Sequence, residues 1–135
     1  MNYTTSQIAT IIKATCNIHT DCQLSVLLTD SRSLTFPEES IFFALVTERN
    51  DGHRYIKELY DKGVRNFVIN YKPAEANEMP EANFLQVTNT LAAMQMLAAY
   101  HRRQFDIPVI GITGSNGKTS VKEWLHQLLQ DDYNI

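Results

Sequence analysis

The order of apolar and polar positions predicts helices that alternate with short strands. Apolar residues recur at helical spacing in four segments, near residues 5–12, 55–60, 91–105 and 121–129. Short apolar runs bounded by polar turns lie between or before them, at residues 24–28, 41–45, 67–69, 84–87 and 109–112. This alternation is typical of an α/β fold.

Local signals mark the ends of two helices and the face of a third. Thr4-Thr-Ser-Gln7 resembles a capping box, which begins a helix. Gly63 follows the second helical pattern and is expected at its C-terminal end. Trp124 falls in the apolar stripe of the last helix, so we expect it in a core.

The last strand and helix are joined by a loop of small residues that ends in Lys118, Thr119 and Ser120. Strand, glycine loop, Lys-Thr and helix is the arrangement that binds nucleotide phosphates through backbone N–H groups and the helix N-terminus. Thr119 or Ser120 would place a hydroxyl on Mg²⁺. Ile112 stands where the strict pattern has its first glycine, so an ordinary strand-to-helix turn is the alternative. The expected phosphate-binding residues are Gly114, Ser115, Asn116, Gly117, Lys118, Thr119 and Ser120.

The length and net charge of the chain exclude several classes of protein. A chain of 135 residues suits one domain, or one small domain and part of another. A net charge of −3 gives no basic face for nucleic acid, and no apolar run is long enough to insert in a membrane. The first residues do not resemble a signal peptide, so we expect a cytoplasmic protein with reduced cysteines. Cys16, His19 and Cys22 match no usual zinc spacing.

We expect a domain boundary near residue 86. Residues 1–86 can close a small domain, and residues 87–135 look like the start of a nucleotide-binding domain. That second domain has a single expected strand and lacks the downstream acid that usually helps to hold Mg²⁺. The sequence therefore predicts a fragment of a longer protein.

The segment Ile110-Gly-Ile-Thr-Gly-Ser-Asn-Gly-Lys-Thr-Ser120 resembles the ATP-binding loop of the Mur ligases, in which the early glycine is also missing. Folylpolyglutamate synthases look similar in this loop. The front of the chain separates the two, because Thr29-Asp-Ser-Arg32, Pro37 through Leu45 and Asp51-Gly-His53 with Tyr55 resemble the N-terminal domain of the MurF type. Glu38 departs from the pattern, since the family commonly has glycine there.

Three further stretches are similar to a subgroup of the family in which the ligase is fused ahead of an alanine racemase. They are Leu28-Thr-Asp-Ser-Arg-Ser33, Asn50-Asp-Gly-His-Arg-Tyr-Ile56 and Gly63-Val-Arg-Asn-Phe67. The resemblance implies pyridoxal phosphate as a cofactor only if a racemase domain follows this chain.

The resemblance implies an ATP- and Mg²⁺-dependent ligase that adds D-alanyl-D-alanine to UDP-N-acetylmuramoyl-tripeptide through an acyl phosphate. Lys118 and Thr119 would be catalytic, and Thr119 would hold Mg²⁺. The residues that would bind the UDP-sugar are Asp30, Ser31, Arg32, Asn50, Asp51 and His53. The alternatives are a local ion pair between Asp30 and Arg32 and a simple helix-entry turn at Asp51.

We expect this chain alone to lack ligase activity, because its nucleotide-binding domain is incomplete. Two rival functions remain open. One is another glycine-loop amide ligase, similar to folylpolyglutamate synthase, and the other is a non-catalytic module that binds a nucleotide. UDP binding by the N-terminal domain would argue against the first, and a longer gene product would argue against the second.

Overall fold

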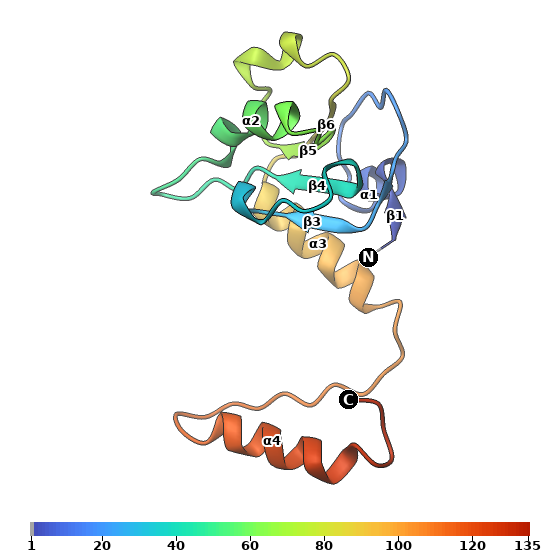
Figure 1. Ribbon diagram of the computed structural model, residues 1–135, viewed down its shortest axis with the longest axis vertical. Helices are drawn as coiled ribbons and strands as arrows, with labels where there is room; N and C mark the ends of the chain where they lie inside the picture. The colour runs from blue at the N-terminus through green and yellow to red at the C-terminus, as the bar shows by residue number, and fades with distance from the viewer. Residues whose placement is uncertain (1) are drawn as a thin grey trace. The chain divides into compact units, whose positions relative to one another are not determined.

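The computed structural model describes residues 2–135, which form two compact units, one up to residue 105 and one of residues 106–135. The first unit contains β1 (Tyr3–Thr4), α1 (Thr5–Ile11), β2 (Gln23–Leu24), β3 (Val26–Leu28), β4 (Ser40–Phe43), α2 (Ile56–Asp61), β5 (Asn66–Ile69), β6 (Asn83–Gln86) and α3 (Thr90–Arg102) (Figure 1). Four 3-10 helices lie between them, η1 (Ser31–Ser33), η2 (Pro37–Glu39), η3 (Gly52–Tyr55) and η4 (Ala74–Glu78).

A four-stranded parallel sheet with the order β3-β4-β5-β6 forms the middle of the first unit. Leu27 pairs with Ile41, Phe42 with Phe67, and Val68 with Leu85. β1 and β2 form a separate antiparallel pair. Because the four strands of the sheet run in the same direction, their carboxyl ends all lie along one edge.

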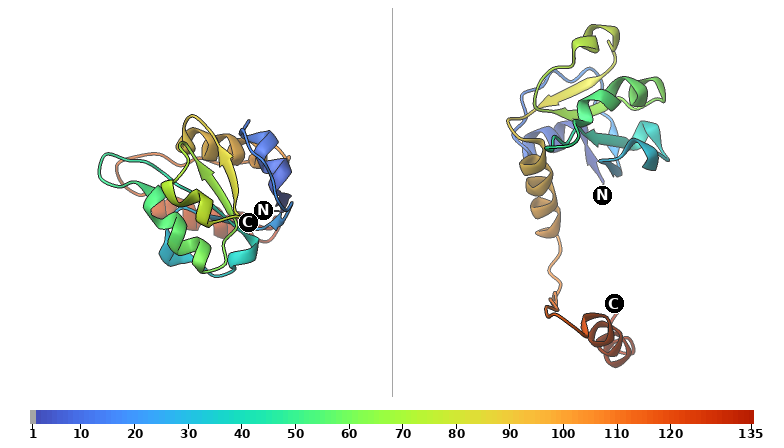
Figure 2. Two further views of the ribbon diagram at one scale, coloured as in Figure 1. Left: turned by 90° about the horizontal axis from the view of Figure 1, so that it is seen from above. Right: turned by 90° about the vertical axis from the view of Figure 1, so that its left-hand side faces the viewer.

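Both faces of this sheet are buried, which explains why its strands are continuously apolar. On one face, Ile41, Phe43 and Val68 pack with α1 and α3. On the other face, Phe42 and Phe67 pack with α2 and with the segment after η4 that holds Met79 and Ala82. Successive residues of β4 therefore enter different cores, as the two-residue period of a strand requires. Figure 2 shows helices on both sides of the sheet. The predicted α/β class is confirmed.

The predicted ends of α1 and α2 are confirmed. The Thr4 hydroxyl accepts a hydrogen bond from Gln7 N, and the Gln7 side chain accepts one from Thr4 N at 2.9 Å. These two bonds satisfy backbone donors of the first turn of α1. Gly63 follows α2 with a φ of 103°, a conformation that glycine adopts without steric strain.

Helix α3 belongs to the first unit and packs onto its sheet. Thr90, Ala93 and Leu97 are buried, and the Thr90 hydroxyl donates a hydrogen bond to Ala44 O at 3.0 Å. His101 Nδ1 lies 2.9 Å from the Tyr3 hydroxyl at the other end of the helix. The first compact unit therefore includes a helix that lies beyond the boundary expected at residue 86.

The second unit contains one helix, α4 (Lys118–Leu129), and no strand within residues 106–135. The prediction of a strand at residues 109–112 is therefore wrong for this structure. Strand N–H and C=O groups need a neighbouring strand, and this unit supplies none. Val109 and Trp124 are 67% and 64% exposed, so the prediction of a core position for Trp124 is also wrong.

Candidate functional site

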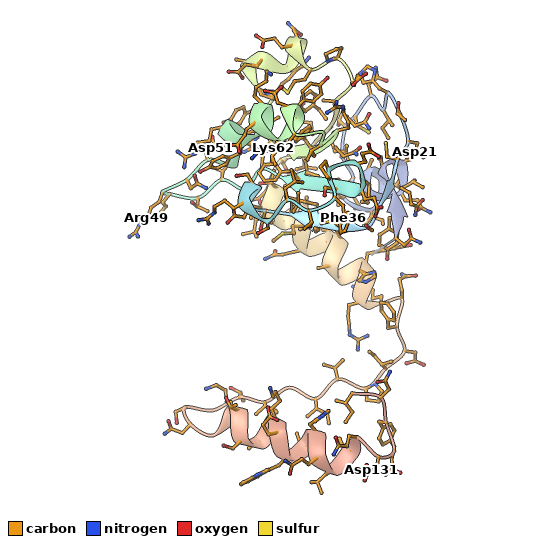
Figure 3. The ribbon with its side chains drawn as sticks, viewed as in Figure 1. Asp21, Phe36, Arg49, Asp51, Lys62 and Asp131 are labelled. Carbon is orange, nitrogen blue, oxygen red and sulfur yellow. The ribbon has the colours of Figure 1, made fainter. Side chains whose placement is uncertain are left out.

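The candidate site is the carboxyl edge of the parallel sheet. Asp30 follows β3, the loop of residues 46–51 follows β4, and Asn70 follows β5. Figure 3 shows the loop that carries Arg49 projecting from the sheet, with Asp51 at its base. Parallel α/β sheets bind ligands at this edge because the loops that follow the strands converge there. The fold thus brings together the two groups of substrate-binding residues that the sequence predicted.

Asp30 and Arg32 form the local ion pair that the alternative interpretation expects. Asp30 caps η1 by accepting a hydrogen bond from Arg32 N at 2.9 Å. The guanidinium Nη2 lies 2.6 Å from Asp30 Oδ2, and Nε lies 3.0 Å from Oδ1. These bonds lower the pKa of Asp30 to about 2. The Arg32 side chain is nevertheless 88% exposed, so its remaining donors can reach a ligand.

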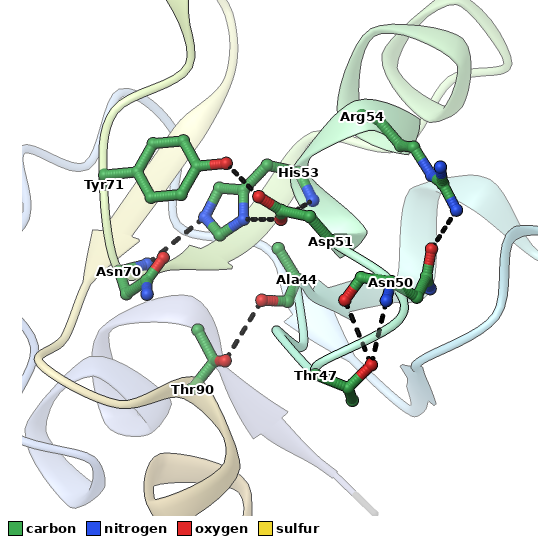
Figure 4. A network of polar contacts seen from close by, with 9 residues as sticks. All are labelled: Ala44, Thr47, Asn50, Asp51, His53, Arg54, Asn70, Tyr71 and Thr90. Carbon is green, nitrogen blue, oxygen red and sulfur yellow. Dashed lines mark hydrogen bonds and ion pairs between the residues drawn. The ribbon is translucent and has the colours of Figure 1, made fainter.

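The loop after β4 is held by a network around Asp51 (Figure 4). Asp51 Oδ1 accepts hydrogen bonds from His53 N at 2.9 Å and from His53 Nδ1 at 2.7 Å. The Tyr71 hydroxyl donates to Asp51 Oδ2. Asn70 N donates to His53 Nε2 at 3.4 Å, so Nε2 is the accepting nitrogen of the ring and Nδ1 the donating one.

Burial and hydrogen bonds together set the charge states of Asp51 and Tyr71. Burial raises the pKa of Asp51, but hydrogen bonds from Tyr71 and His53 outweigh burial and lower that pKa below 3.8. The hydrogen bond between the Tyr71 hydroxyl and Asp51 raises the pKa of Tyr71 above 10.0. Asp51 is thus a carboxylate at neutral pH and Tyr71 a neutral phenol. The His53 side chain is only 4% exposed, so it orients the loop and presents little surface to a ligand.

Gly52 allows two backbone segments to come close together. Gly52 N donates to Leu45 O at 2.8 Å, and a Cβ atom at Gly52 would lie 2.8 Å from Leu45 N and 2.9 Å from Ala44 Cα. Any larger residue would therefore push the loop away from β4. Asp51 and Gly52 do form a helix-entry turn, as the alternative expects, and Asp51 caps η3.

The side chain of Asn50 belongs to the same loop but lies on its surface. The Thr47 hydroxyl accepts a hydrogen bond from Asn50 N at 3.1 Å, and Arg54 donates to Asn50 Oδ1. Asn50 Nδ2 makes no hydrogen bond among the described residues. The exposed amide can therefore donate to a ligand.

Sequence reasoning missed Asn70 and Tyr71, which the structure places in the network. The signal was present, because the two residues directly follow β5, and β5 is the neighbour of β4 in the sheet. Only the order of the strands in the sheet places Asn70 and Tyr71 beside the loop that follows β4.

A hollow of about 560 Å³ lies farther along the same edge, beside the end of β6 and the start of α3. Its lining includes Lys13, Asn70, Gln86, Thr88 and Asn89. This volume is within the range of small-molecule sites in proteins. The hollow shares Asn70 with the Asp51 network, and apolar residues of α3 such as Ala93 and Met96 also line it.

The glycine loop and α4 form the second candidate site, within residues 106–135. Gly114 and Gly117 have φ values of 150° and 77°, which residues with a Cβ rarely adopt. Gly117 precedes α4 without a side-chain cap, so the first N–H groups of the helix are available to an anion. Lys118 Nζ donates to Gly114 O at 2.5 Å, which holds the ammonium over the loop. These residues fit a phosphate group, and the exposed Thr119 hydroxyl can reach a Mg²⁺ ion bound to that phosphate.

Within residues 2–135, no three His, Cys, Asp or Glu side chains gather as a metal site would need. Cys16 and Cys22 are half-buried free thiols. None of the helices in the described part of the chain has both the length and the apolar character to span a membrane.

No family model matches the chain. A UDP-N-acetylmuramoyl-tripeptide–D-alanyl-D-alanine ligase of Synechocystis sp. is 38% identical over 119 residues, which are 88% of this chain and 25% of that protein. The ligase of the same name from Bacillus subtilis is 33% identical over 107 residues, or 79% of this chain and 22% of its own.

A crystal structure of MurF from Acinetobacter baumannii superposes with a TM-score of 0.81 at 28% identity, and covers 98% of this chain and 28% of its own. The chain thus spans about a quarter of the length of the curated relatives it matches. Its α/β fold with a parallel four-stranded sheet matches part of the MurF structures. In sequence and in fold, the chain therefore corresponds to a part of a MurF-type Mur ligase.

Proposed function

We propose that this chain is the N-terminal part of an ATP-dependent ligase of peptidoglycan precursor synthesis, which adds D-alanyl-D-alanine to UDP-N-acetylmuramoyl-tripeptide. The observation that carries the proposal is the convergence of the Asp30–Arg32 and Asn50–His53 loops at one edge of a parallel sheet. The proposed reaction is the one for which the Synechocystis and Bacillus relatives are named.

The carboxyl edge of the sheet would bind the UDP end of the sugar nucleotide. The exposed guanidinium of Arg32 suits diphosphate oxygens, because it presents several donors in one plane. Ser31 and Asn50 offer a hydroxyl and an amide to uracil or ribose. Asp51 and His53 would act mainly by holding the loop, since their polar atoms are bonded to each other and to Tyr71.

The glycine loop would bind ATP. Backbone N–H groups of residues 114–117 would surround phosphate oxygens, and Lys118 would neutralise charge on the phosphoryl group that is transferred. The Thr119 hydroxyl would hold Mg²⁺. The present bond from Lys118 to Gly114 O would give way to the phosphate, which is the stronger acceptor for an ammonium.

The reaction would proceed in two steps. The terminal carboxylate of the tripeptide would take the γ-phosphoryl group of ATP and become an acyl phosphate, releasing ADP. The amine of D-alanyl-D-alanine would then attack the acyl carbon, and inorganic phosphate would leave. The residues that orient the amine would lie outside this chain, in the remainder of a cytoplasmic enzyme. Fusion to an alanine racemase stays a prediction, which the sequence after Ile135 tests.

The test is a ligation assay on the complete protein with UDP-N-acetylmuramoyl-tripeptide, D-alanyl-D-alanine, ATP and Mg²⁺. We expect UDP-N-acetylmuramoyl-pentapeptide and phosphate as products. Lys118→Ala should abolish phosphoryl transfer and leave UDP-substrate binding unchanged, and Lys122→Ala, an exposed lysine on the same helix, should be active.

Two results would contradict the proposal, and a third would contradict the expectation for this chain alone. Glutamate addition to a folate in place of the peptide reaction would favour the folylpolyglutamate-like ligase. ATP binding without any ligation would favour the non-catalytic module. Ligation by residues 1–135 alone would overturn the expectation that this chain is inactive by itself.

A further inference from the structure

We propose that Tyr71 is the stacking platform for the uracil base of the bound nucleotide, which makes it a residue that determines specificity for uridine. This inference rests on the proposed function, because it names how the same edge recognises its ligand. Tyr71 follows β5, so it lies at the carboxyl edge beside the loop that follows β4.

The Tyr71 ring is fixed on one side by two neighbours. Its centroid lies 3.9 Å from that of the His53 imidazole, and the two planes differ by 15°, which is a stacked pair. The phenol hydroxyl donates to Asp51 Oδ2 (Figure 4). His53 is itself held by Asp51 and by Asn70 N. A ring constrained in this way loses little side-chain entropy when a ligand stacks on it.

The other side of the Tyr71 ring remains available. Tyr71 is 45% exposed although His53, on which it stacks, is only 6% exposed. An exposed aromatic ring at the polar edge of a sheet is unusual for a residue whose role is only to fill a core, and planar bases stack on such rings in many nucleotide sites. Asn50, on the loop after the neighbouring strand β4, and Arg32, on the loop after β3, supply the donors for base edges and for phosphate.

The test compares ligands with and without a base. Calorimetric titration of this chain with UMP and with ribose 5-phosphate measures the contribution of the base. We expect Tyr71→Leu to weaken UMP binding by about 5- to 50-fold and to leave ribose 5-phosphate binding unchanged. Tyr71→Phe keeps the ring and loses only the bond to Asp51, so it should bind UMP within about threefold of the unchanged chain. Tyr100→Leu, which alters a tyrosine of similar exposure at the far end of α3, is the matched control.

A second measurement does not depend on the folding of a variant. In the unchanged chain, the uracil H5 and H6 signals should move upfield when UMP binds, with nuclear Overhauser contacts to the Tyr71 ring protons. UMP binding with equal affinity in Tyr71→Leu, or without contacts to Tyr71, would overturn the inference and leave the proposed function intact. Absence of binding by any uridine nucleotide would instead contradict the proposed function.

Discussion

The carboxylate of Asp51 accepts three hydrogen bonds. It accepts hydrogen bonds from His53 N, from His53 Nδ1 and from the Tyr71 hydroxyl, and it caps η3. The loop after β4 therefore depends on a single charge. Asp30 has the same cap and ion-pair arrangement with Arg32, but its bonds all lie within one turn, whereas Asp51 also bonds to Tyr71 on another loop. At this scale, Asp51 should matter most for the shape of the site.

The first prediction concerns the charge of Asp51. Asp51→Asn keeps a capping oxygen and removes the charge, so we expect the free energy of unfolding at pH 7 to fall by about 1 kcal/mol. The folded pKa of Asp51 lies below 3.8, its ordinary value. Its contribution to stability is therefore present above about pH 4 and is lost as the pH falls through the folded pKa.

Urea denaturation of both proteins between pH 7 and pH 2 measures this difference. The gap between them should close in the acid range. Asp131→Asn, at an exposed position in the second unit, is the control and should show no such gap. An equal gap at pH 7 and at pH 2 would show that the charge is not responsible.

The second prediction concerns Gly52. Gly52→Ala places a methyl group 2.8 Å from Leu45 N, so the loop or the end of β4 must shift. We expect a loss of about 1–3 kcal/mol in the free energy of unfolding, measured by chemical denaturation. Gly111→Ala is the matched control, because nothing lies within 4 Å of its Cβ position. Equal stability of the two variants would contradict the close approach described for Gly52.

Among the elements, α3 joins the parts of the first unit. It begins beside β6, donates a hydrogen bond from Thr90 to Ala44 O after β4, and reaches Tyr3 before α1. Its buried positions, Thr90, Ala93 and Leu97, occur at helical spacing. The helix therefore completes one face of the core of this unit.

The third prediction tests that role. Leu97 is 1% exposed and Leu91 is 47% exposed on the same helix. Leu97→Ala should lower the free energy of unfolding by about 2–5 kcal/mol, and Leu91→Ala should lower it by less than about 1 kcal/mol. Thermal and chemical denaturation measure both. A small effect of Leu97→Ala would show that α3 is not part of the first core.

The elements were largely predictable from the sequence because apolar periodicity and capping residues act locally. The capping box at Thr4 and the apolar run of Phe67–Ile69 needed no knowledge of the fold. The strand expected at residues 109–112 was not predictable in this way, since a strand depends on neighbours that residues 106–135 do not supply. The role of Tyr71 was hidden for a similar reason, because only the strand order places it beside Asp51.

Across the whole molecule, the two candidate ligand-binding sites lie in two compact units. The first unit has its own buried core, and its sheet edge carries the Asp30 and Asp51 loops. The second carries the glycine loop, with exposed apolar residues such as Val109 and Trp124.

The central claim is that the nucleotide of the sugar substrate binds at the carboxyl edge of the parallel sheet. The most direct measurement is a titration of the ¹⁵N-labelled chain with UDP, in which amide chemical shifts report the position of the ligand. We predict saturable shifts concentrated at residues 30–32, 50–53 and 70–71, which follow β3, β4 and β5. Shifts confined to other parts of the chain, or no saturable shifts at millimolar UDP, would contradict the claim.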